Sequence, residues 1–74
     1  MNERQVDLEK LKIAREKKGY SQEEMANKMG WSARSKYTKR EKGSVSISAD
    51  ELMKIITLLG YKDHKIHTFY KNER

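Results

Sequence analysis

Four glycines, Gly19, Gly30, Gly43 and Gly60, divide this chain into five pieces of helical length. Glycine is often found just past the end of a helix, because the backbone there turns with a positive φ. The chain contains no proline, which suits short turns between helices. Its 74 residues leave room for one domain only. We therefore expect a single compact all-α domain over residues 1–74, with five helices of which the last is short.

Two capping boxes predict where helices begin. In each, a serine hydroxyl accepts the amide of the residue three places on, and the glutamate there reaches back to the serine amide. The first pairs Ser21 with Glu24, and the second pairs Ser48 with Glu51. Apolar residues at helical spacing follow both boxes. With two residues of the first piece, the expected core is Leu11, Ala14, Met25, Ala26, Met29, Leu52, Ile55, Ile56 and Leu59.

The first piece, about residues 5–18, carries apolar residues on two sides. Leu8 and Leu11 lie on one face at a spacing of three residues. Val6 and Ile13 are one heptad apart and lie on a different side. We interpret this second side as a packing face beneath the C-terminal segment. The alternative is a stripe that binds a partner.

Most of the net positive charge lies in fifteen residues. The chain has 17 Lys and Arg against 11 Asp and Glu, a net charge of +6. Residues 28–42 contribute +5 of it, since their one acidic residue is Glu41. An expected helix over about residues 33–42, with Ser32 as its N-cap, falls in this block and is poor in apolar residues. A concentrated block of one sign predicts a negatively charged partner.

Two short helices with a turn at Gly30, over about residues 21–42, form a helix-turn-helix pattern whose second helix is basic. The pattern resembles the lambda-repressor-like (Cro/C1-type) helix-turn-helix family of small phage transcriptional regulators, in the runs LKIAREKKGYSQEEMANKMGWSARSKYTKREKG and ADELMKIITLLGY. The resemblance covers about residues 8–61. Its most specific elements are Arg15, residues 19–24, Ala26, Gly30, Glu41 and Gly43.

The resemblance implies a five-helix fold that binds double-stranded DNA sequence-specifically, with the helix of residues 33–42 in the major groove. In the family, the glutamine at the start of the second helix contacts a phosphate, and here it is Gln22. Arg34 is the expected reader of a guanine, because its guanidinium fork matches O6 and N7. The DNA-binding residues carried over are Gln22, Ser32, Arg34, Ser35, Thr38, Lys39, Lys42 and Ser44, with Ser46 as a further backbone contact.

The chain departs from the family pattern by one extra residue between Gly30 and Gly43. If the end of the motif is aligned, Tyr37 takes the usual buried aliphatic place and Arg40 falls where an apolar residue is usual. If its beginning is aligned, Lys36 falls at the buried place. We favour the first alignment, with the extra residue in the turn near Trp31.

A monomer would read one half-site, so we expect a homodimer, at least on DNA. The expected dimer surface lies at the C-terminus, where the tail of residues 62–74 forms a short helix from about Asp63. It consists of Tyr61, Ile66, Phe69 and Tyr70. The alternative function is a small protein-binding modulator, an antirepressor or co-repressor, that uses the same fold to bind another repressor. Trp31 and Tyr37 would then contact that partner.

Other classes of function find little support. The absence of cysteine excludes disulfides, thiolate catalysis and Cys-based zinc sites, and it suits the cytoplasm of a bacterial host cell, where we expect association with the nucleoid. His64 and His67 are spaced i, i+3, but two histidines are too few for a typical metal site. No catalytic arrangement is suggested, so we expect no enzyme activity, cofactor or small-molecule substrate. No apolar run approaches the roughly 20 residues that cross a membrane.

Overall fold

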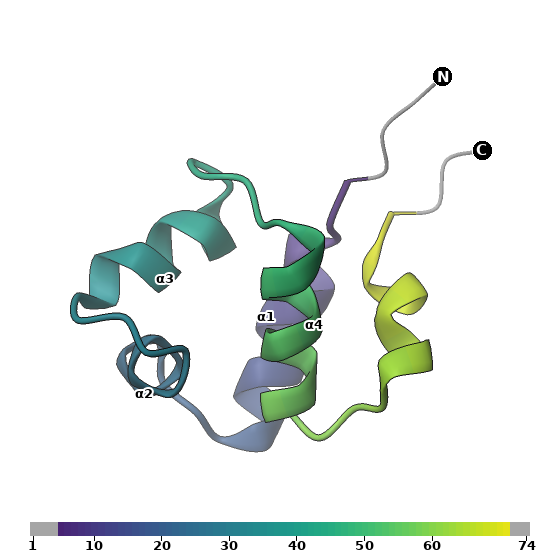
Figure 1. The fold of residues 1–74 in the computed structure, drawn as a ribbon, viewed down its shortest axis with the longest axis horizontal. Coiled ribbons are helices and arrows are strands. Elements are labelled where there is room, and N and C mark those ends of the chain that lie inside the picture. Colours follow the sequence, from purple (N-terminus) through teal and green to yellow (C-terminus); the bar gives the residue numbers. More distant parts are fainter. Residues whose placement is uncertain (1–4, 72–74) are drawn as a thin grey trace.

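The computed structural model describes residues 5–71 and contains the five expected helices (Figure 1). They are α1 (Leu8–Lys18), α2 (Gln22–Lys28), α3 (Arg34–Lys42), α4 (Ala49–Leu58) and the short 3-10 helix η1 (Asp63–Phe69). Within these residues, extended pairing is limited to one isolated antiparallel bridge between Val6 and Tyr70. The predicted all-α fold class is therefore confirmed.

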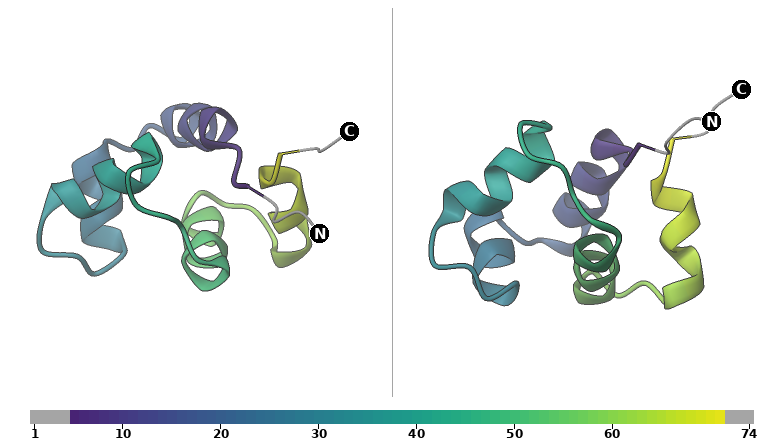
Figure 2. Two further views of the ribbon diagram at one scale, coloured as in Figure 1. Left: turned by 90° about the horizontal axis from the view of Figure 1, so that it is seen from above. Right: turned by 45° about the horizontal axis from the view of Figure 1, so that its top comes forward.

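The helices are arranged in a definite order along the long axis of the molecule. The α2–α3 pair lies at one end, α1 and α4 lie in the middle, and η1 lies at the other end (Figures 1 and 2). This order leaves α3 exposed on its outer side and separates it from η1.

Helix starts follow the predicted caps in two cases and depart from them in one. In both capping boxes the serine hydroxyl and the glutamate carboxylate make their reciprocal hydrogen bonds. At α3, however, the N-cap is Ala33, which makes no side-chain hydrogen bond to the helix. The prediction of Ser32 as this cap is wrong, because α3 begins at Arg34, one residue later than expected, and the cap position therefore falls on Ala33.

The core consists of all nine predicted residues together with Tyr37 and Phe69. The burial of Tyr37 agrees with the alignment that gives it the aliphatic place of the family.

The C-terminal segment is part of this core. Phe69 is only 2% exposed, and its ring meets the ring of Tyr61 edge to face at 5.1 Å between centroids. Asp7 donates its amide to the Phe69 carbonyl at 2.7 Å, so η1 is also joined to the start of α1. Phe69 was predicted to meet a partner. Its apolar character is instead explained by packing inside the domain.

The first helix is shorter than predicted. It begins after Asp7, whose carboxylate accepts the amide of Lys10 at 3.1 Å. Val6 lies before the helix and pairs with Tyr70, which confirms that this residue packs against the C-terminal segment. Ile13, in contrast, stays 49% exposed. Val6 and Ile13, which the sequence placed on one side of a helix, therefore have different environments: Val6 packs against the C-terminal segment and Ile13 faces solvent.

Candidate nucleic-acid interface

The helix-turn-helix consists of α2, α3 and the turn from Gly30 to Ala33. The turn leaves α2 at Gly30, which has a φ of +84°. The Trp31 amide then donates back to the Ala26 carbonyl at 2.9 Å, which closes the end of α2. Ala26 is buried between the elements, where its small side chain permits a close approach of the helices.

The outer face of α3 is cationic. Tyr37 and Glu41, one turn apart, point inward and are buried. Five other side chains of α3 are exposed to solvent: Arg34, Ser35, Lys36, Lys39 and Lys42. This exposure is what a helix needs in order to contact the edges of bases in the major groove.

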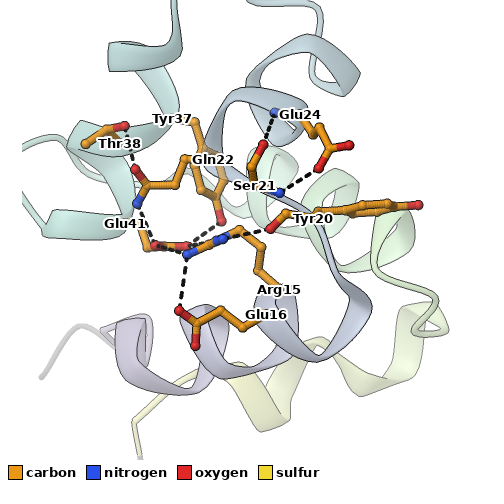
Figure 3. A network of polar contacts seen from close by, with 9 residues as sticks. All are labelled: Arg15, Glu16, Tyr20, Ser21, Gln22, Glu24, Tyr37, Thr38 and Glu41. Carbon is orange, nitrogen blue, oxygen red and sulfur yellow. Dashed lines mark hydrogen bonds and ion pairs between the residues drawn. The ribbon is translucent and has the colours of Figure 1, made fainter.

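A buried ion pair holds α1 against α3 (Figure 3). Arg15 donates from Nε to Oε2 of Glu41 at 2.8 Å and from Nη2 to Oε1 at 3.1 Å, a two-pronged contact. Its Nη1 donates to the Tyr20 carbonyl at 2.7 Å. The side chains of Arg15 and Glu41 are only 8% and 5% exposed. The single acidic residue of the basic segment is thus withdrawn from the surface and neutralised.

Two further donors complete the coordination of this carboxylate. The Tyr37 hydroxyl donates to Oε2 of Glu41 at 2.9 Å, and the Gln22 amide donates to Oε1 at 2.8 Å. Burial works to raise the pKa of Glu41, but the hydrogen bonds from Arg15, Gln22 and Tyr37 outweigh it and hold that pKa below its usual value. Burial, and then the adjacent Glu41 charge, raise the pKa of Tyr37, so this phenol stays protonated and remains a donor.

The network reaches the surface at Gln22 and Thr38. The Thr38 hydroxyl donates to the Gln22 side-chain oxygen at 2.9 Å, while the Gln22 nitrogen is held by Glu41 (Figure 3). The orientation of the Gln22 amide is therefore fixed at both ends, by a carboxylate below it and a hydroxyl on α3. Sequence reasoning predicted Gln22 and Thr38 separately and missed this link between them. The i, i+4 spacing of Tyr37 and Glu41 was the available signal for an inward-facing acid.

Arg40, which we expected at an apolar position of the motif, is held from three sides. Its Nε and Nη2 donate to the two carboxylate oxygens of Glu51 at 3.0 and 3.2 Å, and its Nη1 donates to the Lys36 carbonyl at 2.8 Å. Its guanidinium carbon lies 4.3 Å from the centroid of the Trp31 ring, a cation–π contact. Arg40 therefore joins α3 to the start of α4.

The other predicted DNA-contacting residues surround α3. Ser32 is exposed in the turn before it, and Ser44 and Ser46 are exposed in the connector after it. The Ser44 amide donates to the Lys39 carbonyl at 2.9 Å, which fixes the start of that connector against the end of α3. The structure therefore joins Gln22 to Thr38 and places Ser32 and Ser44 just before and just after α3. Ser46 lies further along the connector, beside a pocket that Val6 and Tyr70 also line, and so stands apart from the other predicted residues.

The residues predicted to bind protein partners are buried or half-buried within the fold. Tyr37 is fully buried and Trp31 is half-buried against Arg40, so Tyr37 offers no surface to another repressor. Tyr61, Ile66 and Tyr70 are half-buried and pack against the core.

Among residues 5–71, no group of three or more His, Cys, Asp or Glu side chains is placed to hold a metal ion. No helix in the same range has the length and apolar character needed to cross a membrane.

A model of the helix-turn-helix family matches residues 11–65 of the chain, a span that includes α2, α3 and α4. Comparisons with curated proteins and with solved structures returned no match.

Proposed function

Because the chain belongs to the lambda-repressor-like (Cro/C1-type) helix-turn-helix family, a family of DNA-binding regulators, we propose that it is a sequence-specific transcriptional regulator of the phage repressor or Cro type. Its recognition element is α3, which enters the major groove. The protein acts on double-stranded DNA as a homodimer that occupies a paired site, since one half-site carries too little sequence information for specific binding in a genome.

One observation carries this proposal: the basic segment has no exposed carboxylate. Within residues 28–42 the one acidic residue, Glu41, is buried against Arg15. The exposed side chains of α3 consequently include four cations and no anion: Arg34, Lys36, Lys39 and Lys42. A helix stabilised for its own sake would mix charges of both signs on its surface. An unopposed cationic face supports contact with phosphate groups.

The polar network gives Gln22 a specific role in this contact. A glutamine amide carries two N–H groups, and Glu41 takes one of them. We assign the other to a phosphate oxygen of the DNA backbone. Because Thr38 holds the amide oxygen, the side chain needs no reorientation on binding. The Thr38–Gln22 hydrogen bond therefore joins α3 to the side chain of α2 that contacts the DNA phosphate, so the phosphate contact fixes the position of α3 on the duplex.

Base reading is assigned to the first turn of α3. Arg34 is its first residue and is exposed, so its guanidinium is free to meet O6 and N7 of a guanine. Ser35 follows it in the same turn, and Lys39 lies one turn further along on the same side of the helix as Ser35; both are exposed. Lys42, at the opposite end of α3, is assigned to the backbone.

Selection from a pool of random duplexes, followed by fluorescence anisotropy on the enriched sequence, tests the proposal. Arg34→Ala should cost about 1–3 kcal/mol and relax the preference at one base position. Lys42→Ala should weaken binding to all sequences alike and lower the salt slope by about one ion. The matched control is Lys65→Ala, an exposed lysine of η1 at the far end of the molecule. It should change neither property.

The proposal is rejected if no sequence is enriched and the residual affinity is the same for every duplex. Equal effects of Arg34→Ala and Lys65→Ala on the enriched duplex would reject α3 as the recognition element.

A further inference from the structure

The surface between α1 and η1 carries an exposed apolar side chain beside a small cavity. Ile13 is 49% exposed, and Val45 at 37% is the other large apolar side chain that is exposed in the part of the chain that the structure describes. Next to Ile13 lies a cavity of about 180 Å³, which is large enough for one apolar side chain. It is lined by Lys10, Ile13, Ala14, Lys17, Tyr61 and Phe69, among others.

The charges around Ile13 follow a symmetric pattern. Glu9 and Lys10 precede it by four and three residues, and Glu16 and Lys17 follow it by three and four. All four are exposed, and this spacing places them on the same face of α1 as Ile13. At each distance from Ile13, an acidic residue on one side is matched by a basic residue on the other: Glu9 by Lys17 at four residues, and Glu16 by Lys10 at three.

We propose that this face of α1 is the contact between two copies of the chain, with their α1 helices packed antiparallel about a two-fold axis near Ile13. In this arrangement Glu9 faces Lys17 of the second copy, and Lys10 faces Glu16. The two-fold axis repeats each pair, so four oppositely charged pairs surround the contact. The Ile13 side chain of each copy enters the cavity of the other, where it meets Tyr61. This inference deepens the proposed DNA-bound dimer by naming its surface.

Charge favours a second copy over an acidic or basic partner. The four charged residues around Ile13 sum to zero, so a partner of one sign would gain no net attraction there. A second copy pairs every one of them. Lys10 is already positioned for this role, because its ammonium donates to the Thr68 carbonyl at 3.0 Å and keeps further N–H groups for a carboxylate.

The location of the contact fits DNA binding. Figure 2 shows η1 at the opposite end of the molecule from the α2–α3 pair. A contact on the side of α1 that meets η1 would therefore leave the cationic α3 of each copy exposed. The contact itself is small, with one apolar side chain from each copy at its centre. Small contacts of this kind belong to the weak, transient class. We therefore expect a dimer that forms at high protein concentration and is favoured when both copies occupy DNA.

Sedimentation equilibrium of the full chain without DNA, up to about 1 mM protein at low salt, tests the inference. Wild type should show a monomer–dimer equilibrium that weakens as salt is added. Ile13→Glu should raise the dissociation constant at least about tenfold, because both buried isoleucines are lost at once. Val45→Glu, the control at the other exposed apolar residue, should leave it unchanged. Circular dichroism checks that each variant keeps its helices.

Charge reversal tests the antiparallel register separately. Lys17→Glu should weaken the dimer about threefold or more, since Glu9 then faces a like charge in both symmetric pairs. The double variant Glu9→Lys with Lys17→Glu should restore it. A wild-type chain that stays monomeric at 1 mM overturns the proposal, as does an Ile13→Glu variant that dimerises like wild type or a double variant no better than the single one.

These outcomes are distinguishable from failure of the proposed function. Dimerisation is measured without DNA, and Ile13→Glu should keep wild-type affinity for a duplex with one half-site. Absence of specific DNA binding in wild type would reject the function and leave the dimer result unaffected.

Discussion

Replacing Arg15 with methionine gives a sharp test of the buried network. Methionine keeps the unbranched apolar stem and removes the guanidinium. The Glu41 carboxylate, 5% exposed, would lose its counter-ion and, of the four hydrogen bonds that it accepts within residues 5–71, the two from Arg15. Removing one partner of a buried pair costs about 3–5 kcal/mol. Gln22 and Tyr37 still donate to the carboxylate, so we place the loss for Arg15→Met near the lower end of that range.

Urea denaturation followed by circular dichroism at pH 7 measures this loss. Lys12→Met is the matched control, since Lys12 is an exposed base on the same helix, and it should change the free energy of unfolding by less than about 0.5 kcal/mol. Adding Glu41→Gln to Arg15→Met removes the unpaired charge and keeps an oxygen for Tyr37 to donate to. The double variant should recover at least about 1 kcal/mol. A loss below about 1 kcal/mol for Arg15→Met, or additive losses in the double variant, would refute this account.

Lowering the pH should reduce the difference in stability between wild type and Arg15→Met. In wild type the pKa of Glu41 lies below its usual value, so the ion pair stabilises the fold above about pH 4.3 and this stability is lost as the pH falls through the lowered pKa. In Arg15→Met the buried carboxylate lacks its cation, and we expect its pKa to rise above the unfolded value. A carboxyl group whose pKa is raised by folding stabilises the fold at pH values below its unfolded pKa. This stabilisation is lost as the pH rises through the raised pKa. The difference in unfolding free energy should therefore shrink between pH 7 and pH 4.

Two predictions concern the core. Ile56→Ala should lower the free energy of unfolding by about 2–5 kcal/mol in urea denaturation, because Ile56 is fully buried; a loss below about 1 kcal/mol would remove α4 from the core. Phe69→Ala should cost about 3–5 kcal/mol for the same reason, and deletion of residues 62–74 should unfold much of the domain in circular dichroism. A truncated chain with full helical content and stability would show that η1 is dispensable.

The helices were predictable because their signals are local. A capping box such as Ser21 with Glu24 satisfies backbone amides within four residues, and the apolar face that follows it needs only a period of 3.6. Because such signals are local, the core could be predicted from them, and all nine predicted core residues are buried. The place of Phe69 was not predictable in the same way. A short apolar face serves equally well for burial in its own domain and for contact with a second copy, and three-dimensional packing decides between them.

The position of Arg40 shows why the candidate site could be predicted only in part. A guanidinium at an apolar position requires a partner, and its neighbour in sequence, Glu41, is taken by Arg15. The partner is Glu51, which the sequence assigned to the cap of α4. One oxygen, Oε1 of Glu51, accepts both the Ser48 amide at 3.2 Å and Nε of Arg40 at 3.0 Å.

Both requirements are met because a carboxylate has lone pairs for more than one donor. The hydrogen bonds from Arg40 also hold the pKa of Glu51 below its usual value, so the cap keeps its charge. Trp31, in the turn before α3, completes the arrangement by covering the guanidinium. An aliphatic residue at position 40 would leave Trp31 and Glu51 without their common partner, so Arg40 holds the turn before α3 and the start of α4 against the same side chain.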